Sequence, residues 1–200
     1  MSILDTLFRK VNSALKKEIK NASDSLQKAA ATKTKTVTFD ELPKTLDEFK
    51  ALPYSGLKDP YEVTALTIAA LCRFADDREA SVEMLNYLRG PRPLSPMDVS
   101  FIKDRFMDGV DYIPRSYLNG TSPDNDYTPN VPYSVTVIEL SPSREQFSQG
   151  YLRLYLRSSG ADSERFLDLR HKPSTDQWFL WEFGGLLSGI RIPKSKDAWA

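Results

Sequence analysis

The spacing of apolar residues divides the chain into a helical first part and a strand-forming second part. Between residues 37 and 108 apolar positions recur about every three to four residues, as they do on one face of a helix. Between residues 133 and 192 they alternate with polar positions, as in a strand with one buried face. Helices followed by strands indicate the α+β class. We therefore expect a helical half packed on a four- to five-stranded antiparallel meander sheet.

Four helix starts follow from a repeated local pattern. Each has a Ser, Thr or Asp that can cap the helix, followed three positions later by an acidic residue that suits the positive end of the helix. The pairs are Thr45 with Glu48, Asp59 with Glu62, Asp76 with Glu79, and Ser95 with Asp98. They predict helices over residues 46–51, 60–74, 77–89 and 96–107.

The predicted helix 60–74 is apolar around its whole circumference. Only Glu62 and Arg73 carry a charge within it, so we expect this helix to be buried at the centre of the fold. Cys72 is the only cysteine of the chain. It is expected to be an inert core residue, because no histidine is near it in the sequence to activate the thiol.

Four segments of the second part are predicted to be strands. They are residues 133–140, 151–157, 165–171 and 177–183, and residues 186–192 are a candidate for one more. Segment 151–157 alternates strictly, so its three leucines fall on one side. We expect that leucine face to lie against helix 60–74.

The opposite side of segment 151–157 is the best-defined candidate binding surface. Tyr151, Arg153, Tyr155 and Arg157 would project from it together. Asp168, Arg170 and one tryptophan, Trp178 or Trp181, are candidates to join them from the neighbouring strands of the meander. Tyrosine and arginine side chains on a sheet can stack on rings or bind anions. A solvated sheet face with cross-strand pairs would show the same pattern, so both interpretations stay open.

Residues 109–132 interrupt the helical and the strand pattern with four prolines and an Asn-Gly turn. A segment of this length without an element of its own is either a functional loop or an ordered strap that packs on the domain. If it is a functional loop, its candidate ligand-binding residues are Tyr112, Arg115, Tyr117 and Tyr127.

The N-terminal residues 1–36 differ from the rest in charge, with eight Lys or Arg against three acidic residues. Residues 3–20 have the pattern of a basic amphipathic helix, and a flexible linker is expected up to residue 36, before a single domain over 37–200. The helix could contact an anionic membrane surface, or pack on its own domain or on a second copy. The candidate contact residues are Leu4, Leu7, Phe8, Val11, Leu15, Lys16 and Lys17.

Composition argues against several classes of function. The chain has 27 basic and 27 acidic residues among 200, so nucleic-acid binding is not expected. One histidine and one cysteine provide no set of zinc ligands, and we expect neither a metal nor another cofactor. No nucleophile elbow or lysine-bearing phosphate loop occurs, so no catalytic residue is assigned. The absence of a secretory leader pattern and of a bilayer-length apolar run favours a cytoplasmic location.

Several short stretches form a specific combination. They are residues 160–163, 169–170, 178–182, 190–195 and 199–200, together with 94–96, 104–109 and 126–129. The combination resembles a family of bacterial proteins of unknown function, found mainly in Gram-positive bacteria. Ala198 departs from the family pattern, which has proline before Trp199. The resemblance implies a bacterial cytoplasmic domain and assigns no activity and no site residue.

These observations predict a non-enzymatic protein-interaction module with an N-terminal docking helix. Its partner would be an unidentified protein or a second copy, with peripheral membrane contact through residues 3–20 as a further possibility. The alternative is a small-molecule-binding or hydrolytic domain. Its pocket would lie between helix 60–74 and the sheet, roofed by residues 109–132.

Overall fold

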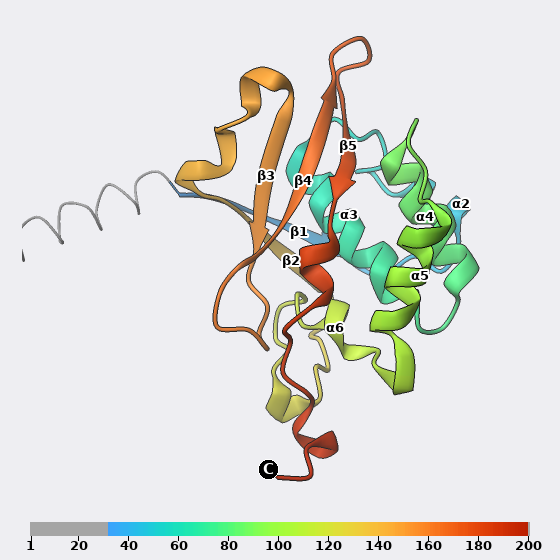
Figure 1. Ribbon diagram of the computed structural model, residues 1–200, viewed down its shortest axis with the longest axis vertical. Helices are drawn as coiled ribbons and strands as arrows, with labels where there is room; N and C mark the ends of the chain where they lie inside the picture. The colour runs from blue at the N-terminus through green and yellow to red at the C-terminus, as the bar shows by residue number, and fades with distance from the viewer. Residues whose placement is uncertain (1–31, 200) are drawn as a thin grey trace, which may run out of the picture. The chain divides into compact units, whose positions relative to one another are not determined.

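The four predicted helices are present in the computed structural model, which describes residues 32–199 (Figure 1). They are α2 (Leu46–Ala51), α3 (Pro60–Cys72), α4 (Arg78–Arg89) and α5 (Pro96–Arg105), and the one-turn α6 (Tyr112–Arg115) follows. The side chains of Thr45, Asp59, Asp77 and Ser95 accept hydrogen bonds from first-turn backbone amides, which explains where the four longer helices begin. The α4 cap is Asp77 and not the expected Asp76.

Five strands form one sheet in the order β1-β2-β3-β4-β5, which confirms the predicted α+β class. The strands are β1 (Lys33–Phe39), β2 (Tyr133–Glu139), β3 (Tyr151–Leu156), β4 (Arg165–Lys172) and β5 (Gln177–Glu182). The pairs β2/β3, β3/β4 and β4/β5 are antiparallel. Sequential strands are neighbours, as expected for a meander.

The fifth strand is β1, and not residues 186–192. The C-terminal stretch instead forms a 3-10 turn, Gly184–Leu187, followed by irregular chain. Residues 33–36 were expected in a linker but belong to β1, where Thr36 Oγ1 lies 3.0 Å from Thr136 Oγ1 of β2. The linker interpretation was wrong for these residues because their strand pairing depends on a partner 100 positions away.

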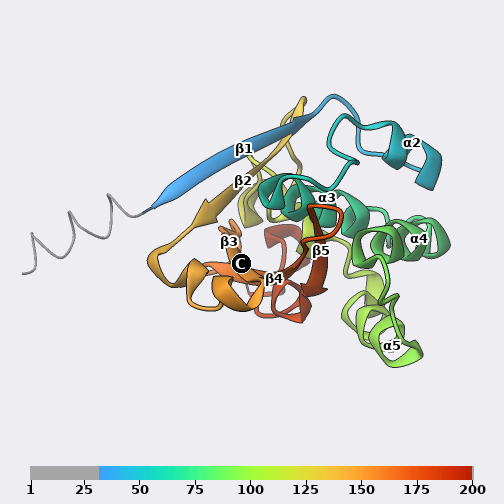
Figure 2. The same cartoon turned by 90° about the horizontal axis from the view of Figure 1, so that it is seen from above.

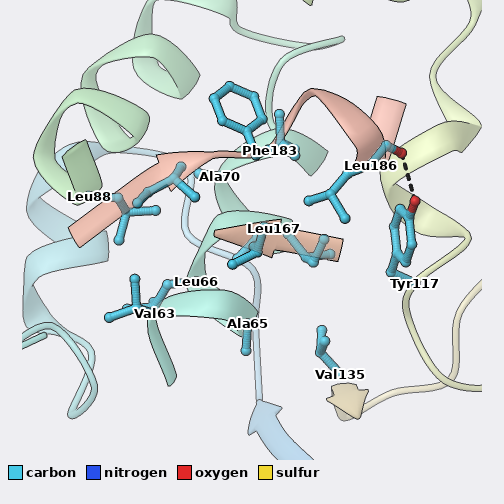
Figure 3. Close-up of a cluster of buried hydrophobic side chains, with 14 of the residues drawn as sticks. Val63, Ala65, Leu66, Ala70, Leu88, Tyr117, Val135, Leu167, Phe183 and Leu186 are labelled. Atoms are coloured by element: carbon cyan, nitrogen blue, oxygen red, sulfur yellow. Dashed lines mark hydrogen bonds between the residues drawn. The ribbon is translucent and has the colours of Figure 1, made fainter. Parts of the chain in front are cut away.

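Helix α3 is buried at the centre of the fold, as predicted. Nine consecutive residues, 63–71, are buried, and Figure 2 shows α3 lying against the sheet with α4 beside it. Leu152, Leu154 and Leu156 of β3 are 0–1% exposed, and Figure 3 shows Leu167 of β4 in the same apolar cluster as α3. Each buried leucine contributes about 1.5–3 kcal/mol. The space between α3 and the sheet is thus filled by apolar side chains.

Residues 109–132 form an ordered strap. Tyr112, Tyr117 and Tyr127 are 6%, 3% and 0% exposed. The Tyr117 hydroxyl donates to the Leu186 carbonyl at 2.6 Å, a bond drawn in Figure 3, and the Tyr127 hydroxyl donates to the Arg191 carbonyl at 2.6 Å. The strap therefore fastens the chain after β5 to the domain. Among residues 32–199, no helix has the length and apolar character needed to cross a bilayer.

Candidate functional site: an aromatic–arginine face on the sheet

The side chains of β3 and β4 that point away from α3 form a mixed aromatic and arginine surface. The strand register pairs Tyr151 with Arg170, Arg153 with Asp168, and Tyr155 with Phe166. Because side chains alternate along a strand, these six residues share the side opposite to the leucines. Two further residues complete the surface, one from β5 and one from the turn after α4. We call this set the aromatic–arginine face: Arg92, Tyr151, Arg153, Tyr155, Phe166, Asp168, Arg170 and Trp181.

Four of these residues form a continuous stack. The Arg92 guanidinium lies 4.3 Å from the Trp181 ring centroid, and the Trp181 and Tyr151 rings meet edge to face at 5.5 Å. The Arg170 guanidinium lies 4.2 Å from the Tyr151 ring centroid. Aromatic quadrupoles attract cations placed over their faces, by about 0.5–1 kcal/mol at exposed sites. Two aromatic rings are thus bracketed by two positive charges.

The end of α4 brings Arg92 to Trp181. Gly90 ends the helix with φ +56°, and a Cβ at this position would lie 2.3 Å from the Phe179 ring, so only glycine allows this close approach to β5. The buried Arg89 then donates from Nε to the Arg92 carbonyl at 3.0 Å and from Nη1 to the Trp181 carbonyl at 3.1 Å. Arg89 therefore fixes the backbone of both stacking partners.

The third arginine of the face is neutralised. Arg153 donates from Nε and Nη2 to the two carboxylate oxygens of Asp168 at 2.7 and 2.9 Å. The hydrogen bond to Asp168 raises the pKa of Arg153 above its usual value. The same guanidinium lies 3.9 Å from the Phe166 ring centroid, and Phe166 meets Tyr155 edge to face. This half of the face is an ion pair whose guanidinium lies over the Phe166 ring, with Tyr155 packed against that ring.

A small hollow lies beside the face, between β3 and the segment 141–149. Its volume is about 80 Å³, and its walls include Tyr151, Tyr155 and Gln146. In Figure 2 this segment lies on the other side of β3 from α3. Arg144 anchors the segment by donating to Glu139 at 2.6 and 3.1 Å. A hollow of this size can hold a small side chain or a few water molecules.

The structure places three of the eight predicted ligand-binding residues on this face: Tyr151, Arg153 and Tyr155. Arg157 was expected beside them but lies beyond the end of β3, where its Nη2 donates to Glu164 at 3.1 Å.

The loop candidates lie elsewhere. Tyr112, Tyr117 and Tyr127 are buried, and Arg115 donates to Asp111 at 2.8 Å. These four residues therefore form no exposed ligand surface with β3, because the tyrosine rings complete the core. The candidate contacts Leu4, Leu7, Phe8, Val11, Leu15, Lys16 and Lys17 lie outside the described residues.

Two members of the face were not predicted as binding residues. Phe166 could have been found, since it alternates with Asp168 and Arg170 along β4. No sequence pattern around Arg92 indicates that it belongs to the face. It lies 89 residues before Trp181 in the sequence, and the two meet only because α4 ends against β5.

A second concavity lies at the C-terminal end of α3. It measures about 460 Å³ and is lined by Cys72, Arg73 and Tyr133, among others. Cys72 was expected in the core but is only partly buried, because it lies at the edge of the core where α3 ends. Desolvation still raises the pKa of Cys72 to about 12, so the thiol is neutral near pH 7 and a poor nucleophile.

The single histidine of the chain, His171, lies near the end of β4. The ring of His171 lies 4.6 Å from the Trp178 ring, and its Nε2 is 3.0 Å from Asp176 Oδ1. No serine, threonine or cysteine hydroxyl or thiol is hydrogen-bonded to that histidine in the described region. Nor do three His, Cys, Asp or Glu side chains gather there in a way that could hold a metal ion.

Comparison with known proteins gives one match. The model of a family described as a domain of unknown function (DUF6935) covers residues 41–194. No curated protein and no solved structure shows significant similarity to the chain. The matched range includes every residue of the aromatic–arginine face and the α-helices α2 to α6. The chain therefore belongs to the family defined by this domain of unknown function, DUF6935.

Proposed function

We propose that the chain is a non-enzymatic protein-interaction module that binds a partner protein through the aromatic–arginine face. The observation that carries this proposal is the stack of Arg92, Trp181, Tyr151 and Arg170. Tryptophan, tyrosine and arginine are the residues most enriched at the energetic centres of protein interfaces. Their mutual stacking holds them in place before binding, which reduces the entropy lost when a partner docks.

The alternative, a small-molecule or hydrolytic pocket between α3 and the sheet, has less support. Leu152, Leu154 and Leu156 fill that space and are 0–1% exposed. Ligand pockets usually measure roughly 300–1,000 Å³. The hollow beside the face has only about 80 Å³, and the concavity of about 460 Å³ lies at the C-terminal end of α3, outside the leucine-filled space.

The N-terminal residues extend the proposal. The basic amphipathic pattern of residues 3–20 suits a docking helix, which would contact the partner, a second copy or an anionic membrane surface. A cytoplasmic location, with an unidentified protein or a second copy as partner, is part of the same proposal.

Site-specific photo-cross-linking of the full chain tests the proposed function. Benzoylphenylalanine replaces Phe166, which is exposed on the face, or Glu83 as a control on the exposed side of α4. In the cells that normally make the protein, we expect a discrete protein adduct from position 166 and not from position 83. The adduct should disappear when Trp181→Ala is added in the same chain. Identical adducts from both positions, or none from position 166, would contradict the proposal.

A further inference from the structure

We infer that the segment bound on the aromatic–arginine face is acidic. It would be a carboxylate-bearing stretch of a partner protein, held by Arg92 and Arg170 on either side of the Trp181–Tyr151 ring pair. This inference rests on the proposed function and adds the chemistry of the partner.

Arg92 and Arg170 are the two arginines of the face that form no ion pair with a carboxylate. Within residues 32–199 no carboxylate oxygen lies within 4.0 Å of either guanidinium, whereas Arg153 is paired with Asp168. Arg170 donates from Nη1 to the Gln149 carbonyl. A guanidinium has five N–H donors, so both arginines keep donors for a ligand.

Stacking orients these donors outward. A guanidinium that lies over a ring uses its face for the ring and leaves its edge, which carries the N–H groups, available. That edge matches the two oxygens of a carboxylate, and charge-assisted hydrogen bonds of this kind are about twice as strong as neutral ones. The rings of Trp181 and Tyr151 restrict the arginine side chains before binding, so less conformational entropy is lost when a carboxylate arrives.

Nearby acidic side chains already have partners. Asp98 Oδ2 accepts hydrogen bonds from the Ser95 amide at 2.8 Å and from its hydroxyl at 2.9 Å. Glu182 Oε1 accepts from the amides of Phe183 and Gly184 at 3.0 and 2.9 Å. Asp98 also interacts electrostatically with Arg89 and Arg92. Neither carboxylate forms an ion pair within 4.0 Å of Arg92 or Arg170, so a carboxylate from outside has an open position at the arginines.

The charge pattern favours an acidic peptide over a nucleic acid. Nucleic-acid grooves carry continuous positive charge along the phosphate backbone. Here Asp168 lies in the middle of the face and Glu182 follows Trp181 at its edge. Two separate cations flanking two rings suit spaced carboxylates with apolar or aromatic side chains between them.

The test measures binding of a fluorescently labelled random copolymer of glutamate and tyrosine to the full-length protein. Arg92→Gln with Arg170→Gln removes the two unpaired charges. The matched control, Arg78→Gln with Arg157→Gln, removes two exposed arginines that are not on the face. We expect the first double variant to bind the copolymer at least about tenfold more weakly than the parent protein, since each lost charge-assisted bond weakens binding several-fold. The affinity of the control double variant should stay within about twofold of the parent value.

A single variant guards against a folding defect. The Arg92 side chain is exposed and makes no hydrogen bond within the described chain, so Arg92→Gln should leave the fold intact and still weaken binding about threefold.

Other results of the binding measurement would overturn the inference. No copolymer binding, or equal losses in both double variants, would overturn the acidic partner. Binding of an oligothymidylate through Arg92 and Arg170 more tightly than the copolymer would also overturn it and identify a nucleic acid. In each case the adduct from position 166 still reports on the proposed function separately.

Discussion

Replacing Gly160 by alanine tests the strap that fastens the chain after β5. An alanine Cβ at this position would lie 2.1 Å from the Tyr127 hydroxyl oxygen and 2.7 Å from Cγ2 of Ile190. Gly160 does not have the positive φ that disfavours alanine. The expected cost is therefore steric, and it depends directly on the position of the Tyr127 ring.

The magnitude follows from how firmly Tyr127 is held. Its side chain is 0% exposed, and its hydroxyl donates to the Arg191 carbonyl at 2.6 Å. Overpacking a core costs about 1–3 kcal/mol, and losing the hydrogen bond adds about 1 kcal/mol. We expect Gly160→Ala to lower the free energy of unfolding by about 2–4 kcal/mol. Urea unfolding followed by circular dichroism measures this value.

A second substitution identifies the clashing atom. Tyr127→Phe alone should cost about 1 kcal/mol through the lost hydrogen bond, but in the Gly160→Ala chain it removes the nearest atom and should cost less or stabilise. Gly56→Ala is the control, since its Cβ would meet nothing closer than 3.9 Å. Its unfolding free energy should stay within about 0.5 kcal/mol of the parent protein. If Gly160→Ala behaved like Gly56→Ala, the described packing of the strap would be wrong.

Three further predictions concern other parts of the chain. Arg89→Gln should lower the free energy of unfolding by about 2 kcal/mol and change Trp181 fluorescence, because the carbonyls of Arg92 and Trp181 lose a buried donor. An unchanged fluorescence spectrum would contradict the role of Arg89 in positioning Trp181. Since the pKa of Cys72 is raised to about 12, the native thiol should react with iodoacetamide at pH 8 far more slowly than in urea-unfolded protein, and faster only as the pH rises towards 12; equal rates at pH 8 would contradict the raised pKa of this thiol. Lys16→Glu with Lys17→Glu should reduce co-sedimentation of the full chain with phosphatidylserine vesicles, whereas equal pelleting would remove the membrane contact.

Elements with local signals could be predicted from the sequence. The caps of α2, α3 and α5 place a hydroxyl or carboxylate next to the amides it satisfies, within three residues. The alternation in β3 likewise shows both of its faces without reference to a partner.

Elements that depend on distant partners could not be predicted. The lysines and threonines of β1 form a strand because β2 lies beside them. The strap tyrosines are buried because the chain after β5 returns over them, and nothing in residues 109–132 themselves separates that outcome from an exposed loop. Arg92 joins the face through the packing of α4 on β5. Sequence analysis therefore found the strand half of the candidate site and missed the contribution of the helical half.

Nuclear magnetic resonance of the full chain with the glutamate–tyrosine copolymer tests the central claim most directly. The account predicts that the indole N–H of Trp181 and the Nε–H groups of Arg92 and Arg170 shift on titration, while the indole of the core residue Trp178 does not. Shifts confined to the residues that line the concavity beside Cys72 would contradict the assignment of the aromatic–arginine face as the binding surface. Shifts of the Trp178 indole equal to those of Trp181 would also contradict it.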